Sequence, residues 1–185
     1  AFGLRGLFDW PLGSIDAGGS VVLGASDGSG FQGYLDQARL FARNVSAQSV
    51  SQLHADVPVA AFPLDEAANS STFVNAAGSS NATCTSCPTS GVTGKVGRAA
   101  DFNGGHMLNA ANHAVFNPTG SFAMSVWVNP RSWPASYPNI IYKPNQYSLY
   151  RNDRGELEFI GVGLPAGRNQ VTTTLPAINQ WHHIV

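Results

Sequence analysis

The stretch Phe122-Ala-Met-Ser-Val-Trp-Val128 indicates the fold class of this chain. It combines aromatic, β-branched and small apolar residues, which favours a strand inside a packed core. Further runs of similar character follow it at spacings of about ten residues, separated by turns that contain Gly, Pro or Asn. These runs are residues 139–142, 147–151, 156–160 and 171–175. Short strands at this spacing are typical of a β-sandwich or jelly roll.

Strand signals also occur earlier in the chain, at residues 20–24, 31–41, 59–62 and 99–102. The only helix signal is residues 46–55, where Ser46 can cap a helix with Val50 and Leu53 on one face. We therefore predict an all-β chain, an antiparallel β-sandwich of the jelly-roll type with one short helix near 46–55.

One strand carries a residue that its position does not explain. Counting from Tyr34, strict alternation places Asp36 on the same face as Ala38 and Leu40. That face is the more apolar one, and a carboxylate there needs a partner for its charge.

Composition is typical of a secreted β-protein. Apolar residues make up 43% of the chain, enough for a packed core, whereas charged residues make up 11% and the net charge is −1. Lys95 and Lys143 are the only lysines and no basic run exists, so we expect neither nucleic-acid binding nor a polybasic membrane contact. No apolar stretch approaches the roughly 18 residues that span a bilayer, so no membrane insertion is expected within this window. We predict an extracellular or cell-surface location.

The two ends of the chain suggest a boundary inside it. Residues 180–185 form an apolar, strand-like run with no polar tail, and residues 33–41 resemble the closing strand of a domain. Pro58 ends the helix signal between them. We therefore expect a chain cut across two consecutive domains, with residues 1–56 in the first and 57–185 in the second.

Several motifs, as a set and in this order, resemble a laminin-G-like domain of the concanavalin A-like lectin/glucanase type. They are Pro58-Val-Ala-Ala-Phe-Pro-Leu-Asp-Glu66, Gly94-Lys-Val-Gly-Arg-Ala-Ala-Asp-Phe-Asn-Gly104, Phe122-Ala-Met-Ser-Val-Trp-Val-Asn-Pro130, Tyr147-Ser-Leu149 and Trp181-His-His-Ile-Val185. Residues 18–24 and 31–41, with the helix signal after them, resemble the C-terminal end of the same family.

The resemblance implies tandem copies, because the end of the family's domain precedes its beginning. Residues 1–56 are then the C-terminal part of one laminin-G-like domain, and 57–185 are the N-terminal two-thirds of the next. Neighbouring laminin-G-like domains of the same or another chain are the expected partners. The alternative is that residues 1–55 and 58–185 complement each other in a single sandwich, since chain ends in such folds lie close together.

The two cysteines, Cys84 and Cys87, lie in an uncharged, turn-rich loop. A C-x-x-C spacing can be a redox pair, half of a zinc site or a local disulfide. The redox motif needs a helix N-terminus, and zinc needs two further ligands, neither of which the sequence offers nearby. We favour a disulfide that stabilises the loop.

Calcium is the metal that the sequence best accommodates. Asp65 and Glu66 follow a first strand of the domain, and Asp36 lies on a last strand. The family resemblance implies that these strands are neighbours, so the three carboxylates are candidate ligands of a structural Ca²⁺. Otherwise, Asp36 pairs with Arg39 or with a backbone N–H.

Exposed aromatic residues are candidates for sugar binding. Trp133 and Tyr137 lie in a loop between strands, where ligand contacts concentrate, and can stack on the apolar face of a hexose. The alternative for Trp133 is that it closes the open end of the sandwich.

The sequence contains no convincing catalytic set. Glu156 and Glu158 share a strand face, but we interpret them as solvated residues, because the family's Glu-x-Asp-x-x-Glu glycosidase string is missing. His182 and His183 are adjacent on a strand, so they face opposite ways and do not share one metal ion.

We therefore predict a non-catalytic, extracellular laminin-G-like module for adhesion or for carbohydrate or protein recognition in a multi-domain surface protein. Glycans and surface proteins are its possible ligands. Two alternatives remain open: a structural repeat of a surface fibre or sheath that binds no small ligand, and an accessory module of an extracellular glycoside hydrolase.

Overall fold

A computed structural model describes residues 18–26, 29–42, 57–78, 80–120, 122–135, 137–162 and 169–185. The helix expected at 46–55 lies outside these residues. Within them, the helical structure is a single 3-10 turn, Ala114–Phe116. None of the described segments forms a helix with the length and hydropathy needed to cross a membrane.

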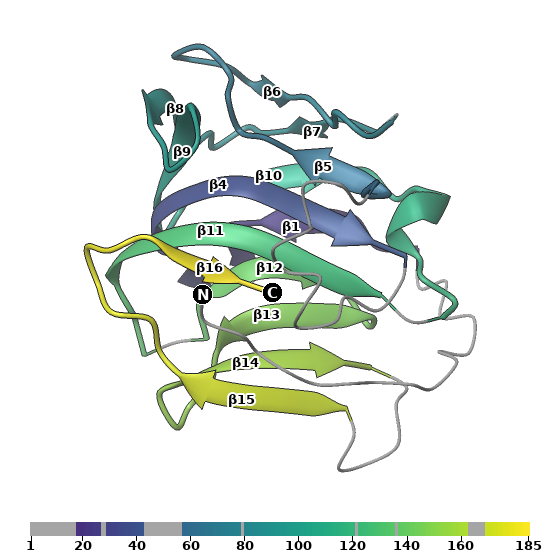
Figure 1. Ribbon diagram of the computed structural model, residues 1–185, viewed down its shortest axis with the longest axis vertical. Helices are drawn as coiled ribbons and strands as arrows, with labels where there is room; N and C mark the ends of the chain where they lie inside the picture. The colour runs from purple at the N-terminus through teal and green to yellow at the C-terminus, as the bar shows by residue number, and fades with distance from the viewer. Residues whose placement is uncertain are drawn as a thin grey trace.

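The described residues form two sheets that pack face to face as a sandwich, which confirms the predicted all-β fold (Figure 1). The ten-stranded sheet contains β1 (Val21–Leu23), β2 (Ala25–Ser26), β3 (Ser29–Gly30), β6 (Thr72–Phe73), β7 (Ala82–Thr83), β10 (Leu108–Ala110), β12 (Asn139–Lys143), β13 (Tyr147–Arg151), β14 (Glu156–Gly161) and β15 (Gln170–Thr174). The six-stranded sheet contains β4 (Gln32–Phe41), β5 (Ala60–Phe62), β8 (Thr89–Thr93), β9 (Arg98–Asn103), β11 (Ala123–Ser132) and β16 (His182–Ile184).

Strand β4 is the centre of the six-stranded sheet. One of its edges pairs with β11 along almost its whole length, from Phe41 opposite Ala123 to Gln32 opposite Ser132. Its other edge is shared between two strands, because β9 pairs with the first half of β4 and β5 pairs with the second half. β4 is therefore hydrogen-bonded on both sides.

Strands from both sides of the expected boundary at residues 56 and 57 share both sheets. β4 lies between β11 and β9, and β1 lies between β12 and β10. The described residues thus form one sandwich, as the single-sandwich alternative predicts, and the boundary falls between two strands of one sheet. The derivation of residues 1–56 and 57–185 from two tandem copies stays a prediction.

A β-bulge corrects the expected facing of Asp36. The register between β4 and β11 shifts beside Gln37, whose φ is 51°. The extra residue means that Leu35, Ala38 and Leu40 all belong to the core, while Asp36 pairs with Trp127 on the opposite face. Strict alternation was the wrong assumption here, since a bulge reverses the facing of every residue beyond it.

Close backbone packing holds β4 against β11. A Cβ atom at Gly33, where φ is 149°, would lie 2.3 Å from the carbonyl oxygen of Asn129. Between the sheets, Leu35, Phe102 and Val126 are fully buried together with residues of the ten-stranded sheet such as Ile140 and Leu157. One continuous core therefore contains side chains from both sequence segments.

Candidate functional site

The predicted disulfide is present between Cys84 and Cys87, with their Cα atoms 5.0 Å apart. It closes the loop after β7, where Cys84 packs against the edge of the core. Because the closed loop is so short, the bond fixes local geometry and contributes little to global stability.

Asp36 and Asp65 both accept hydrogen bonds from the backbone of the turn that joins β8 to β9. Oδ2 of Asp36 accepts the N–H of Val96 at 2.8 Å, and Oδ1 of Asp65 accepts the N–H of Arg98 at 2.6 Å. A Cβ atom at Gly97, where φ is 67°, would lie 2.5 Å from that Asp65 oxygen. Because Gly97 has no side chain, the carboxylate of Asp65 can approach the backbone of this turn.

The environment of Asp36 disfavours the ionised form of its carboxyl group. Its side chain is buried, and Oδ1 has no hydrogen-bond partner. Burial is the main reason why the pKa of Asp36 rises from 3.8 to about 6; the charge of Asp65 also raises it, whereas the N–H groups of Val96 and Lys95 oppose the shift. Arg39 donates to Gln37 instead, so the backbone N–H alternative describes Asp36 and the Arg39 alternative does not.

Glu66 does not join the two aspartates. Its Oε1 accepts the N–H of Val74 at 2.8 Å, and its Oε2 is buried without a partner. Among the described residues, no three His, Cys, Asp or Glu side chains gather as a metal site. The structure therefore brings together Asp36 and Asp65, but not the predicted set of three carboxylates.

Trp133 packs inward, as the alternative role for this residue predicts. Its Nε1 donates to the carbonyl of Pro176 at 2.9 Å, and its ring meets the edge of Phe31 with centroids 5.7 Å apart. It lies against the core and closes one end of the sandwich.

Tyr137, in the same loop, points outward. The residue is 49% exposed and has a φ of 50°, a conformation uncommon for a bulky side chain. Asn139 donates to its carbonyl at 3.2 Å, and its ring lies 6.1 Å from that of Tyr150 at an angle of 34°. The loop thus presents an aromatic surface beside β13.

Polar side chains continue from this surface along the hairpin of β13 and β14. The Tyr150 hydroxyl donates to Oε1 of Glu158 at 2.9 Å. Nδ2 of Asn152 lies 2.8 Å from Oε2 of Glu158 and 3.0 Å from Oε2 of Glu156, so one amide bridges two carboxylates. Burial, followed by the hydrogen bond and charge of Glu158, raises the pKa of Tyr150, so the phenol stays protonated and continues to donate.

The sequence analysis missed Tyr150 and Asn152 and was wrong about Glu158. Glu158 is only 5% exposed, so it is not a solvated residue of the strand face. The available signal was the hairpin itself: its register places Tyr150 opposite Glu158, and cross-strand pairs share a face.

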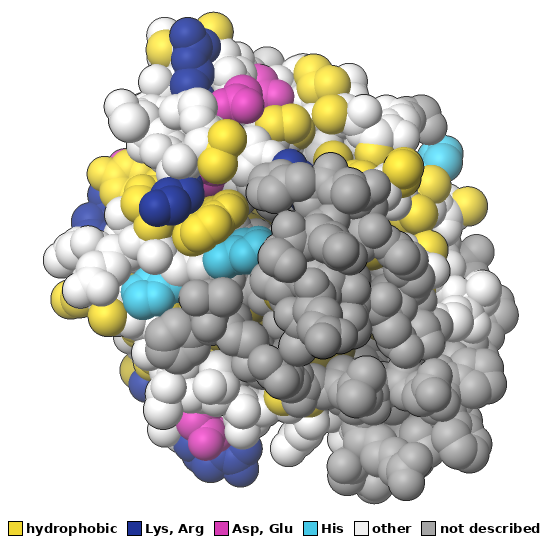
Figure 2. All heavy atoms as spheres, viewed as in Figure 1, with side chains coloured by type: hydrophobic (Ala, Val, Ile, Leu, Met, Phe, Trp, Pro, Cys, Tyr) yellow, Lys and Arg dark blue, Asp and Glu magenta, His cyan; other side chains and the backbone are white. Residues whose placement is uncertain are grey.

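The outer face of the six-stranded sheet carries a second group that the sequence analysis missed. Trp127 stacks on His183 with ring centroids 4.7 Å apart, and Lys95 lies over the same indole. Figure 2 shows hydrophobic, basic and histidine side chains side by side on this face. His183 and His182 face opposite ways, as expected, because their β11 partners are Trp127 and the core residue Val128.

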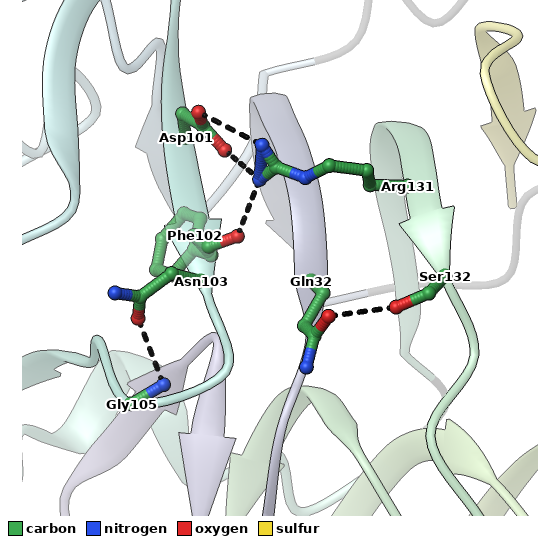
Figure 3. Close-up of polar contacts among 7 residues, drawn as sticks. All are labelled: Gln32, Asp101, Phe102, Asn103, Gly105, Arg131 and Ser132. Atoms are coloured by element: carbon green, nitrogen blue, oxygen red, sulfur yellow. Dashed lines mark hydrogen bonds and ion pairs between the residues drawn. The ribbon is translucent and has the colours of Figure 1, made fainter.

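An ion pair crosses the same face near one end of β4. Arg131 of β11 reaches over β4 to Asp101 of β9 and also donates to the carbonyl of Phe102 at 3.0 Å (Figure 3). Its guanidinium lies 5.6 Å from the centre of the Tyr34 ring. Nearby, Ser132 donates to Gln32 at 2.7 Å, so these contacts link β9, β4 and β11.

A comparison with protein families gave one match. Residues 102–185 match a laminin-G family model described as the concanavalin A-like lectin/glucanases superfamily. Over these residues the chain is similar to laminin-G-like domains. Laminin-G-like domains are generally extracellular and typically non-catalytic. Searches of curated proteins and of solved structures gave no match.

The raised pKa of Asp36 makes the stability of this sandwich depend on pH. The folded state holds this proton up to about pH 6, whereas an ordinary aspartate releases it near 3.8. We predict that the free energy of unfolding, measured in urea with a metal chelator, falls by up to about 3 kcal/mol from this group as pH rises from about 4 to 6.

The Asp36→Asn variant removes this titrating group, so its stability profile should lack that decrease. Its unfolding free energy at pH 7 should also approach or exceed that of the unmodified protein. A variant profile parallel to the original over this pH range would show that Asp36 is not the group responsible.

Proposed function

We propose that this chain is a non-catalytic recognition module of an extracellular surface protein and that it binds carbohydrate at the surface formed by Tyr137 and Tyr150, with the buried Asn152 and Glu158 holding Tyr150 from behind. The observation that carries this proposal is the outward position of Tyr137. A tyrosine ring that is half exposed and held in an uncommon backbone conformation is more typical of binding surfaces than of packing.

The chemistry of the neighbouring groups supports a sugar ligand. Two aromatic rings at 6.1 Å offer faces for the apolar side of a pyranose. Beneath the rings, the buried Glu158 accepts hydrogen bonds from Tyr150 and from Asn152, which fixes the position of the Tyr150 ring. The internal hydrogen bonds among these side chains hold them in place before a ligand arrives, which reduces the entropy cost of binding.

We further propose that Asp36 and Asp65 bind one Ca²⁺, without Glu66. Oδ1 of Asp36 is a buried carboxylate oxygen with no donor, and Asp65 adds a second negative charge close by. A calcium ion would satisfy the first and neutralise the second. Its other ligands would be carbonyl oxygens and water, since two carboxylates do not fill six to eight positions.

Tyr137→Ala tests the recognition site. We predict that binding to an array of neutral glycans falls at least about tenfold in this variant, because one stacking surface is lost. Ile178→Ala is the matched control, since Ile178 is equally exposed at 49% and lies in a different loop. Unchanged binding by Tyr137→Ala, or an equal loss in Ile178→Ala, would contradict the proposed site.

Thermal unfolding tests the calcium proposal separately. At pH 7, millimolar calcium should raise the melting temperature of the unmodified protein by several degrees and leave that of Asp36→Asn unchanged. Glu66→Gln should keep the response to calcium, because Glu66 bonds to Val74 instead. No response in the unmodified protein, or loss of the response in Glu66→Gln, would show that the assignment to Asp36 and Asp65 is wrong.

A further inference from the structure

The two sheets end in four terminal strands, which differ in how well they are protected against pairing. β6 is two residues long, so it does not offer a long template. β8 is five residues long but carries a bulge between Ser90 and Val92, which disrupts its edge. Short strands and bulges are the usual means by which sheet proteins avoid edge-to-edge association.

β15 has none of these protections. Its five residues, Gln170-Val-Thr-Thr-Thr174, contain no charge and no proline, and they pair with β14 in an unbroken register. Among the described residues, no strand other than β14 pairs with β15. Its outer edge lies at one end of the ten-stranded sheet in Figure 1. Within the described part of the chain, its outer backbone N–H and C=O groups therefore have no strand partner.

We propose that β15 pairs with β15 of a second copy of this chain, antiparallel and about a two-fold axis, so that the two larger sheets become one continuous sheet. A two-fold axis brings identical strands together in antiparallel orientation, the arrangement in which each edge complements itself. The strand is centred on Thr172, so full overlap places Thr172 opposite its own counterpart. Threonine pairs are favourable across antiparallel strands.

Electrostatics does not oppose this contact. The nearest acidic side chains on the sheet, Glu156 and Glu158, belong to β14 and lie one strand back from the edge. Three strand spacings then separate them from their counterparts, about 14 Å. This exceeds the screening length of about 8 Å at physiological salt, so their repulsion is small. A net charge of −1 adds little further repulsion between copies.

The size of the contact determines its strength. Pairing of five residues on each side buries much less than the roughly 1,200 Å² of a stable complex. The association is therefore weak, with a dissociation constant between about 10 μM and 1 mM. Such a contact matters where copies are concentrated, for example along a surface that carries many of them.

Sedimentation equilibrium with Thr172→Lys tests the proposal. In the paired state two lysine side chains would extend from opposite Cβ atoms about 5 Å apart, and repulsion between these like charges should lower the association constant about tenfold. In the monomer, the new lysine lies opposite Glu158, so the fold should tolerate it; circular dichroism melting checks this. Thr89→Lys on β8 is the matched control and should associate as the unmodified protein does.

Cysteine cross-linking identifies the register. Thr172→Cys should form an intermolecular disulfide under mild oxidation, and Thr89→Cys should not. The proposal is overturned if the protein stays monomeric at 1 mM, a concentration within the range expected for pairing. It is also overturned if Thr89→Lys weakens association as much as Thr172→Lys, or if Thr89→Cys cross-links and Thr172→Cys does not. Loss of glycan binding in Tyr137→Ala bears on the recognition site and leaves this contact unaffected.

Discussion

The structure depends on one strand, β4, being inserted between β11 and β9. β4 is ten residues long, pairs on both edges and supplies three residues, Leu35, Ala38 and Leu40, to the core of the sandwich. Each of the two leucine side chains contributes roughly 1.5–3 kcal/mol when it leaves water. Without β4, the strands β11 and β9 would each expose an unpaired edge in the middle of the sheet, which sheet proteins avoid. Residues 58–185 therefore need a strand in this position.

One edge of β4 is shared between β9 and β5, and this explains the position of Asp36. β9 pairs with residues up to Leu35 and β5 pairs from Ala38 onward, so the bulge at Gln37 falls where the two neighbours meet. Asp36 lies at this junction and reaches the turn before β9, while Asp65 reaches the same turn from the segment after β5. The two carboxylates thus tie the turn between β8 and β9 to the place where one neighbour of β4 ends and the next begins. The same turn carries Lys95 over Trp127, which couples the junction to the outer face of the sheet.

Sequence patterns predicted the sandwich because most of its strands are apolar runs between turn residues, and β11 to β14 lie close to their expected positions. The facing of Asp36 was not predictable by alternation, since a bulge leaves no sign in the periodicity of one strand. Of the proposed binding surface, the sequence predicted only Tyr137. Trp133 and Tyr137 share a loop, and sequence does not tell which aromatic ring turns inward. Tyr150, Asn152 and Glu158 meet through the register of a hairpin, which depends on its turn geometry.

Native-state hydrogen exchange tests most directly whether β4 belongs to this sandwich. If it does, the amides of Leu35, Ala38 and Leu40 that bond within the sheet exchange only through global unfolding, with the same opening free energy as those of Val126 and Val128 on β11. The account is contradicted if the β4 amides exchange rapidly while those of β11 and β9 stay protected, because residues 58–185 would then hold together without this strand.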